Sequence, residues 1–134
     1  MSKDVAQGVS IVIPAFNEVG SVESLIKSIH QCCASLPHEI LFIDDGSTDG
    51  TPDAVCRLKA EIPTLKLLVL RKNFGQTAAM AAGIDSAQGE IIVPMDADGQ
   101  NDPEDIRPLL AKINEGFDVV SGWRKYRKDR FVTR

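Results

Sequence analysis

The chain has 134 residues, of which 43% are hydrophobic and 25% charged, so it is long enough to bury one hydrophobic core. Its formal net charge of -4 argues against nucleic acid as a partner, because no surplus of cations is available to neutralise a phosphate backbone. No stretch approaches the roughly 18 apolar residues of a membrane span. The three cysteines form neither a Cys-x-x-Cys pair nor a disulfide framework, which indicates a reducing, cytoplasmic setting.

Strand and helix patterns alternate along the chain. Short apolar, β-branched runs predict strands at Val9–Ala15, Ile40–Ile43, Leu67–Leu70, Ile91–Met95 and Val119–Val120. Between them, apolar residues at helical spacing predict amphipathic helices over 22–33 and 106–113, and a run of very small residues predicts a further helix at 78–83. Helices between successive strands indicate an α/β fold, with a mostly parallel sheet and helices on both faces.

Two further helix starts are marked by a capping residue ahead of a proline. Thr51 precedes Pro52 and Asp102 precedes Pro103, so each pair places a side-chain oxygen before proline at the first helical position. We expect Thr51 and Asp102 to cap the helices that follow them.

The run from Ile91 to Asp98 delivers two carboxylates, Asp96 and Asp98, to the end of a predicted buried strand. In open α/β sheets this carboxyl edge is where ligands bind. Two acids so close repel each other unless one is protonated or a divalent cation neutralises them, and Mg²⁺ or Mn²⁺ shares its remaining coordination sites with substrate phosphates. The pattern predicts a site for a metal-bound diphosphate. An EF-hand does not fit, because Arg107 stands where its bidentate glutamate is required.

Three other loops follow predicted strands. Asn17 and Glu18 come after the first strand, where a plain turn and a first-turn acid are the alternative interpretation. Asp44 and Asp45 come after the second, and a carboxylate there suits the N–H donor of uracil or guanine. The segment 71–76 brings Arg71 and Lys72, which either neutralise phosphate charge or are simply solvated.

These four motifs together resemble the donor half of a family 2 glycosyltransferase of GT-A fold, from about Val9 to the last residue. They read Pro-Ala-Phe-Asn-Glu, Ile-Asp-Asp-Gly-Ser-Thr-Asp, Arg-Lys-Asn-Phe-Gly and Met-Asp-Ala-Asp-Gly-Gln-Asn-Asp-Pro-Glu, in this order. Within that family the chain is most similar to the polyprenyl-phosphate glycosyltransferases. Gly99 stands where these enzymes often carry a leucine.

The resemblance implies an inverting transfer of a sugar from a UDP- or GDP-sugar to an acceptor, most similar to the polyprenyl-phosphate enzymes of cell-envelope or glycan biosynthesis. Two sets of residues are implied. The nucleotide would be bound by Pro14, Phe16, Glu18, Asp44, Asp45 and Asp96. The metal would be held by Asp96, Asp98 and Gln100, and the groups acting on the diphosphate would be Asp96, Asp98 and Arg124.

Family members continue past this point with an acceptor-binding half. We therefore expect an extension at 1–8, a nucleotide-sugar-binding domain at 9–122, truncated before the acceptor half, and a basic segment at 123–134. Cations interleaved with aromatic residues in that segment suit the surface of an anionic membrane, so peripheral contact at the cytoplasmic face is expected of the full-length protein. The alternatives are a truncated module that binds a nucleotide-sugar without turnover, and a sugar-nucleotide pyrophosphorylase. The pyrophosphorylase would need a glycine-rich, Arg-containing loop where this chain has Pro14 to Glu18.

Overall fold

The computed structural model describes residues 8–98, 102–115, 119–120 and 132–133, which belong to two compact units. The first unit lies within residues 1–101 and the second within residues 102–134. The second unit contains the 3-10 helix η1 (Pro103–Asp105), the helix α5 (Ile106–Asn114), and the antiparallel strands β5 (Val119–Val120) and β6 (Val132–Thr133). None of the described helices is both long enough and apolar enough to cross a membrane.

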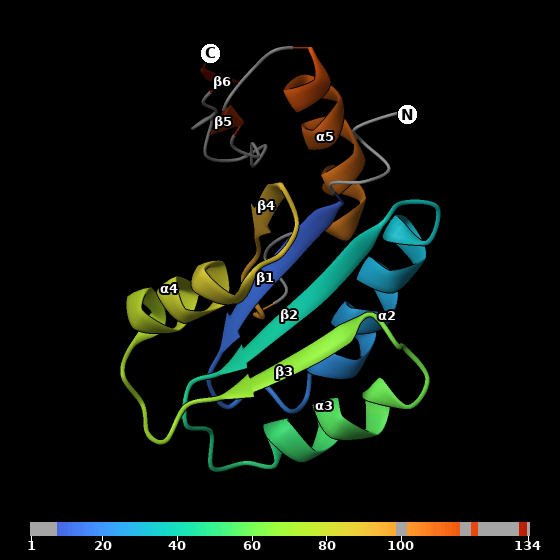
Figure 1. Cartoon of the computed structure of the whole chain (residues 1–134). Coiled ribbons are helices and arrows are strands. Elements are labelled where there is room, and N and C mark those ends of the chain that lie inside the picture. Colours follow the sequence, from blue (N-terminus) through green and yellow to red (C-terminus); the bar gives the residue numbers. More distant parts are fainter. Residues whose placement is uncertain (1–7, 99–101, 116–118, 121–131, 134) are drawn as a thin grey trace. The chain divides into compact units, whose positions relative to one another are not determined.

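The first unit is built on a four-stranded sheet in the order β3-β2-β1-β4 (Figure 1). Its strands are β1 (Val9–Ala15), β2 (His38–Asp44), β3 (Leu65–Val69) and β4 (Ile91–Pro94). All three pairings are parallel, which confirms the α/β fold predicted from the alternating pattern. The carboxyl ends of these strands therefore lie at one edge of the sheet.

The strand boundaries differ from the prediction by at most two residues. The strand β1 has the predicted ends, whereas β2 begins two residues before the apolar run, at His38, and β3 begins at Leu65 instead of Leu67. The start of β2 was not predicted because Glu39 is polar, and the prediction relied on apolar runs. Its carboxylate is nevertheless buried in the strand, where partners from neighbouring segments balance its charge.

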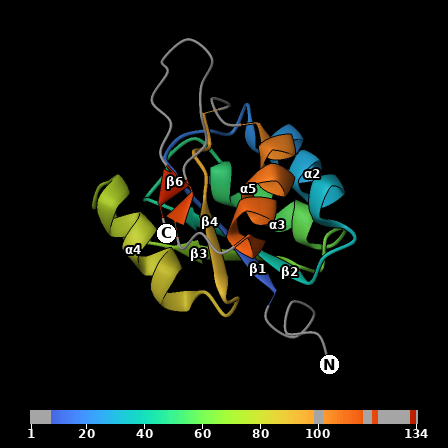
Figure 2. The same cartoon turned by 90° about the horizontal axis from the view of Figure 1, so that it is seen from above.

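Helices cover both faces of this sheet, as predicted. Figure 2 shows α4 (Gln76–Ser86) on one face and α2 (Val22–Cys33) with α3 (Thr51–Lys59) on the other. The apolar residues that predicted α2 are all buried, and they are Val22, Leu25, Ile26, Ile29 and Cys33. On the opposite face, α4 lies so close to the sheet that a Cβ on Gly83 would be 2.4 Å from Val12 Cγ1. Small residues in α4 are therefore a packing requirement.

One of the two predicted helix caps is wrong. Thr51 is the first residue of α3, and the N-cap is Gly50, whose φ of 90° lies in the left-handed region that favours glycine. The Thr51 hydroxyl is used differently, because it donates to Asp49. The cap at Asp102 is confirmed, since its side chain accepts the backbone N–H of Glu104 at the start of η1.

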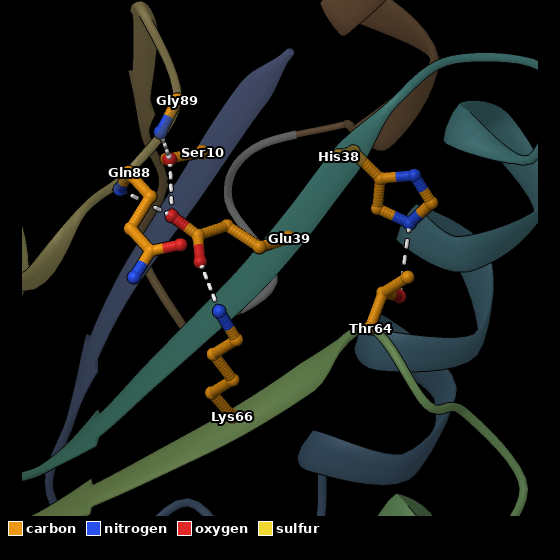
Figure 3. A network of polar contacts seen from close by, with 7 residues as sticks. All are labelled: Ser10, His38, Glu39, Thr64, Lys66, Gln88 and Gly89. Carbon is orange, nitrogen blue, oxygen red and sulfur yellow. Dashed lines mark hydrogen bonds and ion pairs between the residues drawn. The ribbon is translucent and has the colours of Figure 1, made fainter. Parts of the chain in front are cut away.

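A polar cluster around Glu39 joins the amino-terminal halves of the strands (Figure 3). Glu39 Oε2 accepts the Ser10 hydroxyl and the Gln88 backbone N–H, each at 2.6 Å, and Oε1 accepts Lys66 Nζ at 2.7 Å. The Ser10 oxygen in turn accepts the Gly89 backbone N–H at 2.8 Å. One carboxylate thus connects β1, β2, β3 and the segment before β4, and both of its oxygens have partners. Burial alone would raise the pKa of Glu39, but the Gln88, Lys66 and Ser10 donors outweigh it and the pKa lies below its usual value.

We predict that Glu39→Gln lowers the free energy of unfolding by about 1.5–3 kcal/mol at neutral pH, since hydrogen bonds to a charged acceptor are lost. Because the pKa of Glu39 is lowered by folding, its carboxylate stabilises the native state above the ordinary Glu pKa of about 4.3. That stabilisation is lost as the pH falls through the lowered value. Urea unfolding of wild type and Glu39→Gln is measured from about pH 7 to about pH 3. The difference between their free energies of unfolding should become smaller as the pH falls.

The matched control is Glu61→Gln, which changes an exposed glutamate and should leave stability nearly unaltered. A stability difference between wild type and Glu39→Gln that stays constant down to about pH 3 would contradict the ionised role of this carboxylate.

Candidate functional site

The loops after β1 and β2 are joined by side-chain to backbone hydrogen bonds. Asn17 has a φ of 54°, as a turn residue does. Its backbone N–H donates to Ser47 Oγ at 2.7 Å, and its own Oδ1 accepts the Thr48 backbone N–H at 2.8 Å. Asn17 is therefore the turn residue that its alternative interpretation predicted, and it also fixes the first loop against the second.

A second set of contacts centres on Asp49. Its Oδ1 accepts the Thr51 hydroxyl and the Thr51 backbone N–H, and its Oδ2 accepts the Val19 backbone N–H at 3.2 Å. The Thr51 hydroxyl is the main reason why the pKa of Asp49 lies below its usual value. Thr51 Oγ1 also accepts the Glu18 backbone N–H at 3.1 Å, so the start of α3 is connected to the first loop.

The adjacent acids Asp44 and Asp45 have different environments. Asp44 is fully buried, and its Oδ2 accepts the Ser47 backbone N–H at 2.9 Å in a tight turn. Its Oδ1 is buried without a hydrogen-bond partner among the described residues. Asp44 does not line the cleft described below, whereas Asp45 does.

Asp45 holds the loop after β3. Its Oδ1 accepts the Phe74 backbone N–H at 2.8 Å and its Oδ2 accepts the Gly75 backbone N–H at 3.0 Å. The Asn73 side chain donates to the Asp45 carbonyl oxygen at 3.2 Å. The two loops are so close that a Cβ on Gly46 would be 2.5 Å from the carbonyl carbon of Lys72. We refer to the bonds from Asp45 to the backbone of residues 74 and 75 as the Asp45 clamp.

The loop after β4 carries Asp96 and Asp98. Asp96 Oδ1 accepts Gln76 Nε2 at 2.9 Å, so this carboxylate is connected to the first residue of α4. The carbonyl of Ala97 accepts the Ser21 hydroxyl at 3.0 Å, which ties the same loop to the residue before α2. The fourth loop is thus anchored from both faces of the sheet.

These loops enclose a cleft of about 310 Å³ at the carboxyl edge of the sheet. Its lining residues are Pro14, Ala15, Phe16, Glu18, Asp45, Asn73, Gly75, Gln76, Asp96, Ala97 and Asp98. Among these described residues the ionisable side chains are four carboxylic acids, with no lysine or arginine. Lys72 lies instead over the Phe74 ring, with Nζ 5.3 Å from the ring centroid. A cation shared between these carboxylates and an anionic ligand would reduce the repulsion between them.

The donor set suits a hard divalent cation that takes few protein ligands. The described residues contain no cluster of three or more His, Cys, Asp or Glu side chains able to hold a metal. Asp96 and Asp98 supply carboxylate oxygens on the same cleft, and Mg²⁺ is usually bound by one or two carboxylates together with phosphate and water oxygens. The residues present fit such an ion shared with a diphosphate.

Most of the residues predicted for the site lie around this cleft. It is lined by Pro14, Phe16, Glu18, Asp45, Asp96 and Asp98. Gln100 and Arg124 lie outside the residues that the structure describes. The sequence interpretation assigned no site role to Asn73, Gly75 or Gln76, although they follow a strand just as the other motifs do. It concentrated on the cations of that loop, and neither Arg71 nor Lys72 lines the cleft.

Comparisons with known protein families and curated proteins agree with one another. A family model described as Glycosyl transferase family 2 matches residues 10–134. Dodecaprenyl-phosphate galacturonate synthase from Rhizobium johnstonii is 44% identical over 129 residues, which cover 93% of this chain and 38% of that protein. Undecaprenyl-phosphate 4-deoxy-4-formamido-L-arabinose transferase from Salmonella choleraesuis is 43% identical over 124 residues, which cover 90% of this chain and 38% of that protein. The chain thus spans well under half the length of these relatives.

Solved structures show the same fold. The mannosyltransferase PcManGT from Pyrobaculum calidifontis, in complex with GDP-Man and Mn²⁺, has a TM-score of 0.63 and 33% identity over 67% of this chain and 27% of its own. TarS 1–349 from S. aureus, in complex with UDP, has a TM-score of 0.67 and 25% identity, and the match covers 81% of this chain and 32% of the TarS chain.

The Asp45 clamp generates a prediction about local stability. Asp45→Ala removes a charged acceptor worth about 1.5–3 kcal/mol, so the amide protons of Phe74 and Gly75 should exchange with solvent about 10- to 100-fold faster. Native-state hydrogen exchange followed by NMR measures both sites. Asp49→Ala is the matched control, since it removes a carboxylate that contacts the first loop instead. Equal exchange in wild type and Asp45→Ala would show that the clamp does not hold this loop.

Proposed function

Because the chain belongs to glycosyltransferase family 2, we propose that it is the donor-binding part of an inverting transferase that moves a sugar from a nucleoside-diphosphate sugar to a polyprenyl phosphate. Its first unit has the GT-A fold. The proposal of a polyprenyl phosphate as acceptor is supported by the names of the two relatives at 43% and 44% identity. With such an acceptor the reaction would belong to cell-envelope or glycan biosynthesis, and we propose that it takes place at the cytoplasmic face of a membrane.

The observation that carries the proposal is the charge of the cleft. Its described lining residues include four carboxylic acids, and a divalent cation would offset their repulsion of a diphosphate. Asp96 and Asp98 would hold Mg²⁺ or Mn²⁺, with Gln100 as a further ligand. The solved complex of PcManGT with GDP-Man and Mn²⁺ supports a metal in a site of this family.

The nucleotide base would be read at the Asp45 end of the cleft. Each Asp45 oxygen accepts one backbone N–H and keeps lone-pair capacity for another donor. Uracil and guanine both offer N–H groups to a carboxylate, and the complexes of PcManGT with GDP-Man and of TarS with UDP support nucleotides of both kinds. Pro14 and Phe16 would form the apolar wall beside the base, with Glu18 at its edge.

The reaction follows from the charges that these residues arrange. In an inverting transfer the acceptor oxygen attacks the anomeric carbon from the side opposite the nucleotide, and negative charge builds on the leaving diphosphate. Asp96 and Asp98 would hold a cation there, and it would supply electrostatic stabilisation of that charge. Arg124 would add to it. A lipid phosphate is already ionised, so the acceptor needs no general base from this chain.

Donor binding is tested by calorimetry with UDP and GDP. One of the two should bind in the presence of Mn²⁺ or Mg²⁺, and Asp98→Ala should weaken that binding at least about tenfold, or about 1.4 kcal/mol. The control Asp85→Ala removes an exposed carboxylate near the end of α4, away from the cleft, and should bind as wild type does. If UDP or GDP binds with the same affinity in excess chelator as with metal present, the proposed role of the metal is wrong.

Transfer is tested separately, because the chain spans only 38% of the length of the relatives that carry the acceptor assignment. The chain is incubated with radiolabelled UDP- or GDP-sugars, Mn²⁺ and a polyprenyl phosphate in detergent, and label extracted into organic solvent is counted. A wild-type product that Asp98→Ala fails to make supports the transferase proposal. Metal-dependent nucleotide binding without any transfer would favour the alternative, a donor-binding module without turnover in this chain.

A further inference from the structure

The first turn of α4 is held in place on both sides. Gly75 is the residue before the helix, and its φ of 106° lets the chain turn sharply from the third loop into Gln76. Within α4, Ala79 and Gly83 are buried against the sheet. The backbone at Gln76 is therefore fixed by the helix that follows and by the turn that precedes it.

The Asp45 clamp adds a second restraint at the same place. Asp45 accepts the backbone N–H groups of Phe74 and Gly75, the two residues before Gln76. The Gln76 side chain then donates to Asp96 Oδ1 at 2.9 Å. Residues 74–76 thus form a continuous connection between the carboxylate at the base end of the cleft and a carboxylate at its metal end.

We propose that Gln76 is a positioning residue for Asp96, which rests on the function proposed above. Asp96 is only partly buried, and a side chain that binds a metal loses rotamer freedom, so a hydrogen bond that already orients the carboxylate reduces that cost. The Gln76 amide donates to Oδ1, and the two oxygens of a carboxylate together have about four lone-pair sites, so this hydrogen bond is compatible with binding a cation. Partners that orient a ligating carboxylate in this way are typically worth about 10- to 100-fold in metal affinity.

The test uses two variants of Gln76 and a control elsewhere. Gln76→Ala removes the side chain, and Gln76→Met keeps its length while removing the N–H donor. Gln31→Ala makes the same truncation at an exposed position on α2. Mn²⁺ binding is measured from the electron paramagnetic resonance signal of free Mn²⁺ in the presence of UDP or GDP. Binding of uridine or guanosine, which lack the diphosphate, is measured by saturation-transfer NMR.

Both Gln76 variants should weaken Mn²⁺ binding by about 10- to 100-fold and leave nucleoside binding unchanged, while Gln31→Ala matches wild type in both. If Gln76→Met keeps wild-type Mn²⁺ affinity, bulk and not the hydrogen bond is responsible and the inference is overturned. An equal loss of nucleoside and Mn²⁺ binding would also overturn it, because Gln76 would then be a structural residue of the whole cleft.

Failure of the underlying function has a different signature. If wild type binds no Mn²⁺ with either nucleotide, the proposed metal-dependent donor site is wrong and the inference falls with it. If wild type binds Mn²⁺ and the Gln76 variants bind it equally well, only the role of Gln76 is wrong.

Discussion

The parallel pairing of β1 with both β2 and β4 is the constraint on which the candidate site depends. Every residue of β1 is buried, and the strand pairs along its length with β2 and over four residues with β4. Pairing continues just past the strand ends, because Asp45 N–H donates to the Ala15 carbonyl at 2.8 Å and Met95 N–H to the Val12 carbonyl at 2.9 Å. These two bonds place Asp45 and Asp96 at the same edge of the sheet, although 51 positions separate them in the sequence.

Much of this arrangement could be predicted from local sequence patterns. Apolar runs marked the strands, helical spacing marked α2, and the rule that parallel strands share a carboxyl edge brought Asp45, Asp96 and Asp98 together. The difference between Asp44 and Asp45 could not be predicted in this way. Consecutive residues at the end of a strand face opposite sides of the sheet, so one acid is buried in a turn while its neighbour reaches the cleft.

The features that escaped prediction all depend on contacts between distant segments. A Thr ahead of a Pro predicts a cap, yet the Thr51 hydroxyl pairs with Asp49 and accepts the backbone N–H of Glu18, 33 residues away. Likewise, the sequence around Gln76 contains no pattern that predicts the hydrogen bond from its side-chain amide to Asp96. The pair of cations in the third loop looked like the chemical feature there, but the uncharged residues beside them line the cleft. A sequence shows which residues are charged, but it does not show where the side-chain amide of a residue such as Gln76 will lie in the fold.

The two edges of the sheet treat charge in opposite ways. At the amino-terminal edge the Glu39 carboxylate has a donor for each oxygen, and Lys66 balances its charge, so this cluster contributes to stability by itself. At the carboxyl edge the described lining residues of one cleft include four carboxylic acids and no lysine or arginine. A ligand that binds there, and only to the native state, would stabilise that state by an amount that grows with the logarithm of the ratio of its concentration to its dissociation constant. The sheet therefore carries a satisfied carboxylate at one edge, which contributes to stability, and at the other edge it carries the carboxylic acids that suit a cation-bound ligand.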